Sequence, residues 1–517
     1  MLNAGSIRTL TFAVLGVLVV SGAGGAEDAP GWAEIRVVDA ESGRGIPLVE
    51  LETLNGLRFV TDNAGRIAFC EPGLLGREIY FYAQSHGYDA PKDGFSYAGF
   101  RITPRAGEVA EVAMTRRMPA QRLCRLTGEG RYRDTLLLGD APPLPGPVNP
   151  GLVMGQDSVQ ATVHRGRVYW FWGDTQRFGY PLGLFRMAGA TTPIPDPTDP
   201  ASDPAPGIPF DYFVDDTGFA RAMMRLPERP EGVIWVGAVF TVPDASGRER
   251  LVGHYSRRKG LAEEYEQGIA VYDDERDIFE SAARLPLDET WRRPSGHPIR
   301  IEEDGEARLL FGSPNPNVRV RATLEAVLDP AQYEAFTCAR QDDPEQPLLD
   351  ADGKPVWRWQ RDAPPTGSQR ERGWIDAGLI DPADARFCPG DAESPEERIT
   401  LHSGTVRWNA YRERWVLVAG QIGGEPSLLG EVWYAEADAP TGPFAKAVRV
   451  VTHDQQTFYN VCHHAFLDRE DGRLIHFEGT YTNDFSGNPH KTPRYNYNQV
   501  LYRLDLARPE LEAARGE

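Results

Sequence analysis

Alternating apolar and polar residues recur along the chain and predict many short β-strands. Between residues 32 and 118, WAEIRVVD, RIAF and IYFYAQ alternate in this way, and polar segments rich in glycine separate them. Alternation places every second side chain on one face of a strand, so that two such sheets can bury their apolar faces together. We therefore predict a small β-sandwich over residues 32–118.

The turns of this segment have a distinctive sequence. VDAESGRGIP starts at Val38, TDNAGRIAF starts at Thr61, and HGY starts at His86. Together they resemble the regulatory-like domain of carboxypeptidases, which is a transthyretin-like sandwich. The resemblance implies an accessory module that serves attachment or stability rather than catalysis.

A hairpin pattern repeats through the rest of the chain. One interval recurs between an early strand position and a later glycine: Val159 to Gly173, Pro298 to Gly312, Val406 to Gly420 and Ala465 to Gly479. WVGAVFTVPDASGRERLVGHYS is a fifth copy with a longer turn. Repeated antiparallel hairpins of this kind are typical of a β-propeller. We predict an all-β chain in which a five-bladed propeller over 152–510 follows the sandwich, with six blades as the alternative.

A linker is predicted between the two domains, because residues 139–151, GDAPPLPGPVNPG, are rich in proline and glycine. Two segments are candidates for the strand that closes the ring. One is YNQVLYRLDL near the C-terminus, and the other is YRDTLLLGD just before the linker.

The long connections of the predicted propeller all follow second strands of hairpins. They are residues 176–214, 313–398, 421–430 and 480–498. The first strand of each blade starts on the face where the second strand ends, so these loops are expected to wall one pocket over the channel. The polar and aromatic residues expected there are Gln156, Asp157, Trp172, Asp174, Arg177, Arg319, His402, His463, His464, Glu478, Tyr481 and Arg494.

Asp157 begins the tripeptide DSV at the first inner strand of the expected ring. In this position it resembles the catalytic aspartate of the five-bladed propeller glycosidases, namely arabinanases, xylosidases and fructosidases. The resemblance implies a base or nucleophile at Asp157 and extends to no other residue. Glycosidic cleavage needs a second carboxyl group that stays protonated. We assign Glu478 as this acid and Asp174 as a third carboxylate, with Glu431 as a rival acid.

Each of these residues also has a structural interpretation. Asp174 lies in a GDT turn, where aspartate often accepts hydrogen bonds from neighbouring amides. The alternative role for Asp157 is that of a hydrogen-bond partner in the channel wall. Glu478 is compatible with a buried salt bridge to Arg494. Strand alternation leaves one of His463 and His464 in a blade core.

Charge and cysteine content narrow the class of protein. A net charge of −20 argues against binding to nucleic acid or to anionic membrane surfaces. Cys338 and Cys388 flank a polar, proline-rich segment and are candidates for a disulfide, with Cys70 and Cys124 a weaker pair. No CxxC motif suggests a zinc site.

The first 26 residues predict export. An apolar run from Leu10 to Val20 is followed by small residues up to Ala26, which is typical of a cleaved signal peptide over residues 1–26. An uncleaved anchor is the alternative. Cleavage would leave a secreted or periplasmic chain that is free of the membrane.

These features favour a secreted glycoside hydrolase that cleaves a poly- or oligosaccharide without a cofactor. A polysaccharide lyase is one alternative, in which His402 and His464 or His463 would hold a divalent cation in the channel. The other is a propeller without catalytic activity that binds glycan or protein. The sequence has no GxSxG, P-loop or dinucleotide-binding motif.

Overall fold

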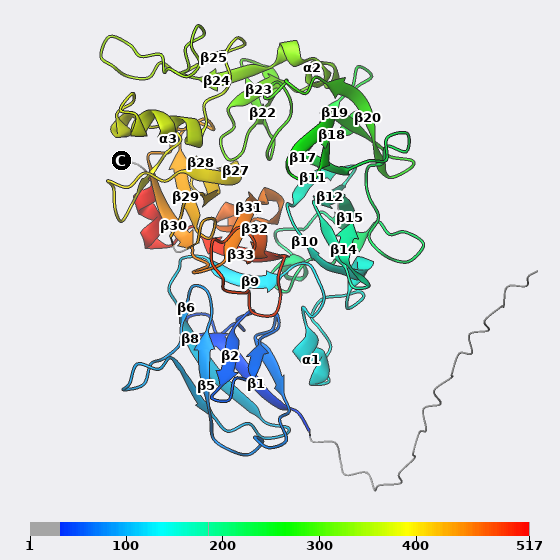
Figure 1. Cartoon of the computed structure of the whole chain (residues 1–517), viewed down its shortest axis with the longest axis vertical. Coiled ribbons are helices and arrows are strands. Elements are labelled where there is room, and N and C mark those ends of the chain that lie inside the picture. The colour runs from blue at the N-terminus through cyan, green and yellow to red at the C-terminus, as the bar shows by residue number, and fades with distance from the viewer. Residues whose placement is uncertain (1–30, 185, 426, 516–517) are drawn as a thin grey trace, which may run out of the picture.

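The computed structural model describes residues 31–184, 186–425 and 427–515, and its strands form a sandwich and a ring of sheets (Figure 1). The predicted signal peptide at residues 1–26 lies outside the described residues. Strands dominate the described chain, which confirms the all-β class. Its α-helices are short: α1 (Arg133–Leu137), α2 (Leu324–Leu328) and α3 (Ser368–Asp376). None of the helices in these ranges is long and apolar enough to cross a membrane.

The N-terminal sandwich has two four-stranded sheets. One has the order β4 (Arg66–Phe69), β1 (Ala33–Asp39), β8 (Val109–Arg116) and β6 (Tyr88–Asp89). The other has the order β3 (Arg58–Val60), β2 (Glu50–Thr53), β5 (Ile79–Gln84) and β7 (Gly99–Ile102). Ala33, Ile35 and Val37 are fully buried while Arg36 between them is exposed, as the alternation in β1 predicts.

Five further sheets surround a common axis (Figure 1). Blade 1 contains β11 (Gln160–His164), β12 (Arg167–Trp172), β15 (Ala188–Pro193) and β16 (Asp211–Tyr212). Blade 2 contains β17 (Val233–Pro243), β18 (Glu249–Lys259), β19 (Glu263–Asp273) and β20 (Ile278–Leu285). Blade 3 contains β21 (Ile299–Glu303), β22 (Glu306–Phe311), β23 (Val318–Arg321), β24 (Glu334–Thr337) and β25 (Arg358–Gln360).

The last two blades complete the ring. Blade 4 contains β27 (Leu401–Asn409), β28 (Arg414–Gln421), β29 (Val432–Ala437), β30 (Lys446–Val451) and the short outer β26 (Gly390–Asp391). Blade 5 contains β31 (Thr457–His463), β32 (Leu474–Thr482), β33 (Asn498–Asp505) and β9 (Gln121–Arg125). A small separate sheet joins β10 (Val153–Gln156), β13 (Thr175–Arg177) and β14 (Tyr180–Leu184). Short 3₁₀ helices occur at η1 (Pro150–Leu152), η2 (Pro200–Ser202), η3 (Pro330–Gln332), η4 (Pro382–Asp384), η5 (Ala465–Leu467), η6 (Glu470–Gly472) and the longer η7 (Pro509–Arg515).

The ring closes through a strand that precedes the linker. β9 pairs antiparallel with β33, so the outermost strand of blade 5 comes from the N-terminal side of the propeller. YNQVLYRLDL supplies β33, the third strand of that blade, while YRDTLLLGD contains helix α1. The closing strand therefore lies next to the sandwich in sequence and ties the two parts of the chain together.

Blade 5 departs from the predicted hairpin. Its inner strand β31 ends at His463, and Cys462 pairs with Glu478. Ala465 lies in the turn η5 and not in the strand, because η5 and η6 lengthen the connection to β32. His463 and His464 are therefore at the end of the inner strand, and Tyr459 and Asn460 occupy its earlier part.

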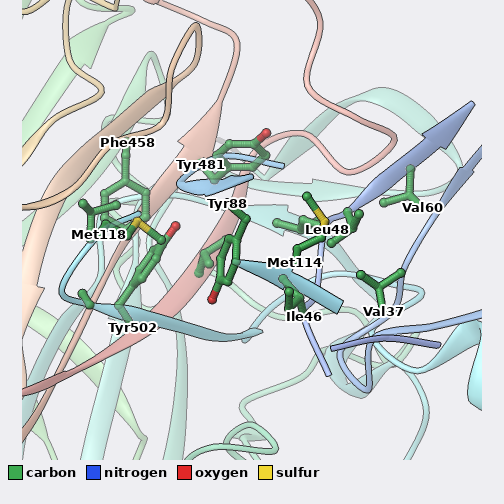
Figure 2. Close-up of a cluster of buried hydrophobic side chains, with 14 of the residues drawn as sticks. Val37, Ile46, Leu48, Val60, Tyr88, Met114, Met118, Phe458, Tyr481 and Tyr502 are labelled. Atoms are coloured by element: carbon green, nitrogen blue, oxygen red, sulfur yellow. The ribbon is translucent and has the colours of Figure 1, made fainter. Parts of the chain in front are cut away.

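One apolar core joins the sandwich to blade 5 (Figure 2). Leu48 and Tyr88 of the sandwich belong to the same buried cluster as Phe458, Tyr481 and Tyr502 of the propeller. Burial of apolar surface is the main attraction between packed elements. The sandwich is therefore packed firmly against the last blade.

Cys338 and Cys388 do not form the disulfide considered from the sequence. Both are buried thiols, and the Cys388 thiol donates to the carbonyl oxygen of Ser368 at 3.1 Å. Burial raises the pKa of the Cys338 thiol to about 12. Each cysteine thus behaves as a small core residue.

Candidate functional site

A cavity of about 630 Å³ lies at the end of the ring where the inner strands begin. Asp157 enters it from the segment between β10 and β11, and Asp174 enters from the segment between β12 and β13. The other polar and aromatic residues of its wall include Trp235 of β17, Tyr459 and Asn460 of β31, and Asp484, Phe485 and Tyr497 of the β32–β33 connection. The cavity thus gathers residues from blades 1, 2 and 5.

Asp157 is held by several hydrogen bonds. The Tyr459 hydroxyl donates to Oδ2 at 2.8 Å, and the backbone N–H of Asp174 donates to Oδ1 at 2.9 Å. Burial raises the pKa of Asp157, while donors from Tyr459, Tyr497, Ser158 and Asp174 act in the opposite direction. These donors stabilise the ionised carboxylate.

Asp174 has a different environment. Its Oδ1 accepts one hydrogen bond, from the Trp235 indole N–H at 2.9 Å. Burial, together with the negative charge of Asp157, raises the pKa of Asp174 to about 6, although the Trp235 hydrogen bond acts in the opposite direction. The cavity therefore contains one carboxylate with many donors and one carboxyl group that retains its proton to near-neutral pH.

Aromatic rings supply much of the apolar wall. Trp235, Tyr459, Phe485 and Tyr497 all line the cavity, and Phe485 stands at its rim with 56% of its surface exposed. The Tyr459 and Phe485 rings meet edge to face with centroids 6.0 Å apart. A concave site with an aromatic wall and a few polar groups is typical of small-molecule and sugar recognition.

The backbone of the cavity is locally strained. Ser158, Asn460, Phe485 and Tyr497 have φ values of 54°, 53°, 60° and 59°. This left-handed conformation costs a residue other than glycine about 1–3 kcal/mol and persists only where its surroundings enforce it. Such strain concentrates at functional sites, and here four strained residues line one cavity.

Glu478 does not join this cavity, so the expectation of three carboxylates in one pocket is wrong. It is fully buried in the middle of β32, where its Oε1 lies 2.7 Å from His464 Nε2. Its partner is therefore His464 and not Arg494. The rival acid Glu431 is also buried, accepts from the Thr452 hydroxyl at 2.8 Å and lies outside the cavity.

The predicted histidines are distributed over different parts of the propeller. His463 is buried and lies 2.9 Å from Asp468, and Nδ1 of His464 lies 3.7 Å from the Cys462 thiol. His402 lines a second cavity. Residues 31–184, 186–425 and 427–515 contain no group of three or more His, Cys, Asp or Glu side chains arranged to hold a metal ion. His402 lines the second cavity, whereas His464 contacts Glu478 and Cys462, so the two histidines have different partners.

Three predicted contacts are instead part of the protein interior. Gln156 is buried and accepts a hydrogen bond from Tyr212 at 2.8 Å, and Trp172 stacks on the same Tyr212 ring. Tyr481 is buried at the junction with the sandwich, where its hydroxyl lies 2.5 Å from His86. Strand alternation alone did not show which face of each strand was covered.

The predicted arginines also lie elsewhere. Arg177 is exposed on β13, outside the lining of the cavity. Arg319 forms ion pairs with Glu303 at 2.6 Å and Glu334 at 2.8 Å. Arg494 lines a groove between the sandwich and the propeller.

The residues expected from the sequence did not include Trp235, Tyr459 or Tyr497. The recurring interval before glycine placed the start of the fifth hairpin too late in the sequence. The first strand of this hairpin begins earlier and contains Tyr459. Trp235 belongs to the hairpin copy with the longer turn. The start of its first strand was not aligned with the starts of the other hairpins, so its position in the cavity was not predicted. Tyr497 follows a long irregular connection that carries no periodic signal.

Comparison with known proteins finds similarity only among solved structures. No family model matches the chain, and no curated protein matches it. A GH43_1 enzyme from Xanthomonas citri is 11% identical, with a TM-score of 0.35 over 71% of this chain and 89% of that one. An exo-1,5-alpha-L-arabinanase from a bovine ruminal metagenomic library is 10% identical, with a TM-score of 0.32 over 68% and 93%. An N-acetylgalactosamine deacetylase from F. plautii is 8% identical, with a TM-score of 0.34 over 74% and 95%. A fold does not by itself define a reaction, so the residues of the cavity decide which chemistry this chain can support.

Proposed function

We propose that this protein is a glycoside hydrolase that cleaves a poly- or oligosaccharide in the cavity between Asp157 and Asp174. The observation that carries the proposal is this pair of carboxyl groups with unequal environments inside an aromatic-lined cavity. Paired carboxyl groups of unequal acidity are what glycosidic cleavage requires. The apolar run before Ala26 supports the further proposal that the enzyme acts outside the cytoplasm.

The two aspartates have separate roles in this reaction. Asp174, whose Oδ1 is occupied by Trp235, carries its proton on Oδ2 and donates it to the glycosidic oxygen as the bond to the anomeric carbon breaks. Asp157, whose ionised form is stabilised by its donors against the effect of burial, acts as the base or nucleophile on the anomeric carbon. As base it takes a proton from the water whose oxygen bonds to that carbon.

The test is hydrolysis of a panel of plant and microbial polysaccharides by the purified exported chain, followed by quantification of reducing ends. We expect new reducing ends from at least one glycan, and none from the Asp157→Asn or Asp174→Asn variants. Unsaturated uronate ends, seen by their ultraviolet absorbance, would identify a lyase instead. Glycan binding without any product would identify a binding propeller.

The acidity of Asp174 predicts the pH dependence of the reaction. The general acid works only when protonated, so kcat/KM falls as the pH rises through about 6. The Trp235 hydrogen bond lowers the pKa of Asp174, so Trp235→Phe raises that pKa and moves the alkaline limb to higher pH. Phe485→Leu, a rim change without contact to Asp174, raises KM and leaves the limb in place. If the alkaline limb of the kcat/KM profile stays at the same pH or moves to lower pH in Trp235→Phe, Asp174 is not the general acid.

A further inference from the structure

A second cavity of about 580 Å³ opens at the same end of the ring, over blades 3 and 4. Its wall includes Trp291 and Arg293 before β21, Asn315 after β22, Gly367 and Arg370 at the start of α3, and His402 of β27. Helix α3 contacts β27, as Figure 1 shows. None of the residues that line this cavity is acidic, although the whole chain contains 75 Asp and Glu residues.

Arg293 lines this cavity without a carboxylate at ion-pair distance among the described residues. Its Nε is buried without a hydrogen-bond partner in that part of the chain. Its Nη1 lies 3.3 Å from His254 Nδ1. Nε2 of His254 lies 3.1 Å from the side-chain amide oxygen Oε1 of Gln267. Nε2 therefore carries the proton, and Nδ1 accepts a hydrogen bond from Arg293. A neutral imidazole thus positions the guanidinium without compensating its charge, and the carboxylates of Glu264 and Glu289 act on that charge only from beyond ion-pair distance.

Further donors lie in the same wall. Asn315 is 2% exposed, and its Nδ2 has no hydrogen-bond partner among the described residues. Helix α3 begins at this cavity, and its N-cap, Gly367, has no side chain to accept from the first-turn N–H groups. Unpaired donors at a helix N-terminus attract anions. A buried donor without a partner is rare in a folded protein and indicates a missing acceptor.

The two cavities are close neighbours in the fold. Gly237 of β17 lines the cavity of Asp157, and Gly237 pairs with His254 of β18. His254 contacts Arg293, which lines the second cavity. One glycan chain that lies across this end of the ring can therefore meet both.

We propose that the second cavity binds an oxyanion, and that this oxyanion is a carboxylate or sulfate substituent of the glycan cleaved at Asp157. The second half of this inference rests on the proposed function, and the first half does not. Arg293 and Asn315 donate to the oxygen atoms of the group, and the first turn of α3 contributes its N–H groups. The substrate class is then an acidic glycan, such as one that contains uronate.

The first test needs no catalytic activity. Inorganic sulfate is added to the folded protein and Tm is followed, with potassium chloride of equal ionic strength as the reference. We expect sulfate to raise the Tm of the wild type and of Arg300→Gln, a control that removes an exposed arginine paired with Glu302. The increase is absent in Arg293→Gln. Asn315→Asp has nearly the same size as the wild-type residue and places a carboxylate in the wall, so it abolishes the increase even if Arg293→Gln folds poorly. Equal responses in all four proteins would overturn the site.

The second test identifies the source of the oxyanion. Asp157→Asn is titrated with uronate oligosaccharides and with the same oligosaccharides after reduction of their carboxyl groups to alcohols. We expect reduction to weaken binding by about tenfold or more, since hydrogen bonds to charged groups are strong. Adding Arg293→Gln removes this preference. If the protein binds the uronate and the reduced oligosaccharides with equal affinity and sulfate still raises Tm, the second cavity binds free anions and not a substituent of the glycan. If the wild type hydrolyses neutral glycans and Arg293→Gln does not change that activity, the substrate class is refuted and the glycosidase is left intact. If the wild type binds the uronate oligosaccharides and hydrolyses no glycan, the glycosidase alone is refuted.

Discussion

Asp157→Asn lowers kcat/KM on the glycan hydrolysed by the wild type by about 10²- to 10⁴-fold, the range expected when a general base is lost. Asparagine keeps the shape of the side chain, and its amide oxygen can accept from the Asp174 N–H, while its NH2 group replaces the oxygen that accepts from Tyr459 and can donate to the Tyr459 hydroxyl oxygen. It lacks the charge that the reaction needs at this position. The change is therefore expected to affect catalysis far more than binding.

The same variant separates catalysis from folding. Burial raises the pKa of Asp157, which means that ionising this carboxyl group costs more free energy in the folded protein than in the unfolded chain. Replacing it with a neutral residue removes this unfavourable term, so Tm does not fall. Asp196→Asn is the matched control, because Asp196 is exposed and the charge change is identical. A large loss of Tm in Asp157→Asn with unchanged kcat/KM would assign Asp157 a structural role.

Glu478→Ala gives the opposite pattern and lowers the free energy of unfolding by about 3–5 kcal/mol, as expected when one partner of a buried ion pair is removed. Glu478 and His464 are both buried and lie 2.7 Å apart. Burial lowers the pKa of His464, but the Cys462 and Glu478 side chains raise it to about 10 overall, so alanine leaves a buried imidazolium with less compensation. Denaturant unfolding measures the loss.

Activity measurements on the remaining folded protein complete this test. Because Glu478 lies outside the cavity, kcat/KM per folded molecule is unchanged in Glu478→Ala. Glu478→Gln keeps a hydrogen bond to His464 and loses less stability. Wild-type stability combined with lost activity would restore Glu478 as the acid that the sequence suggested.

Local patterning was sufficient for the hairpin that carries the candidate site. The alternation before Gly173 correctly indicated β11 and β12, with Asp157 and Asp174 at their open ends. Backbone N–H and C=O groups of Asp157, Gly173 and Asp174 are joined by hydrogen bonds, which are contacts between neighbours in one hairpin. A sequence period can predict such contacts because the turn between the strands is short.

The same reasoning failed in blade 5 because periodicity specifies which face a side chain occupies but not how long a connection is. The turns η5 and η6 lengthen the connection before β32, and this shift put His463 and His464 at the wrong end of the inner strand. Glu478 was likewise taken as a strand end, although β32 continues to Thr482.

The sequence by itself determined the all-β class, the repeated hairpins and the pairing of Asp157 with Asp174, because each depends on residues close together in the chain. Only the tertiary structure decided what surrounds that pair. Tyr459 and Trp235 reach the two aspartates from other blades. Such contacts depend on how the ring closes and how deeply each strand is buried, and no local period encodes either. The acidity of Asp174 is therefore a property of the assembled propeller.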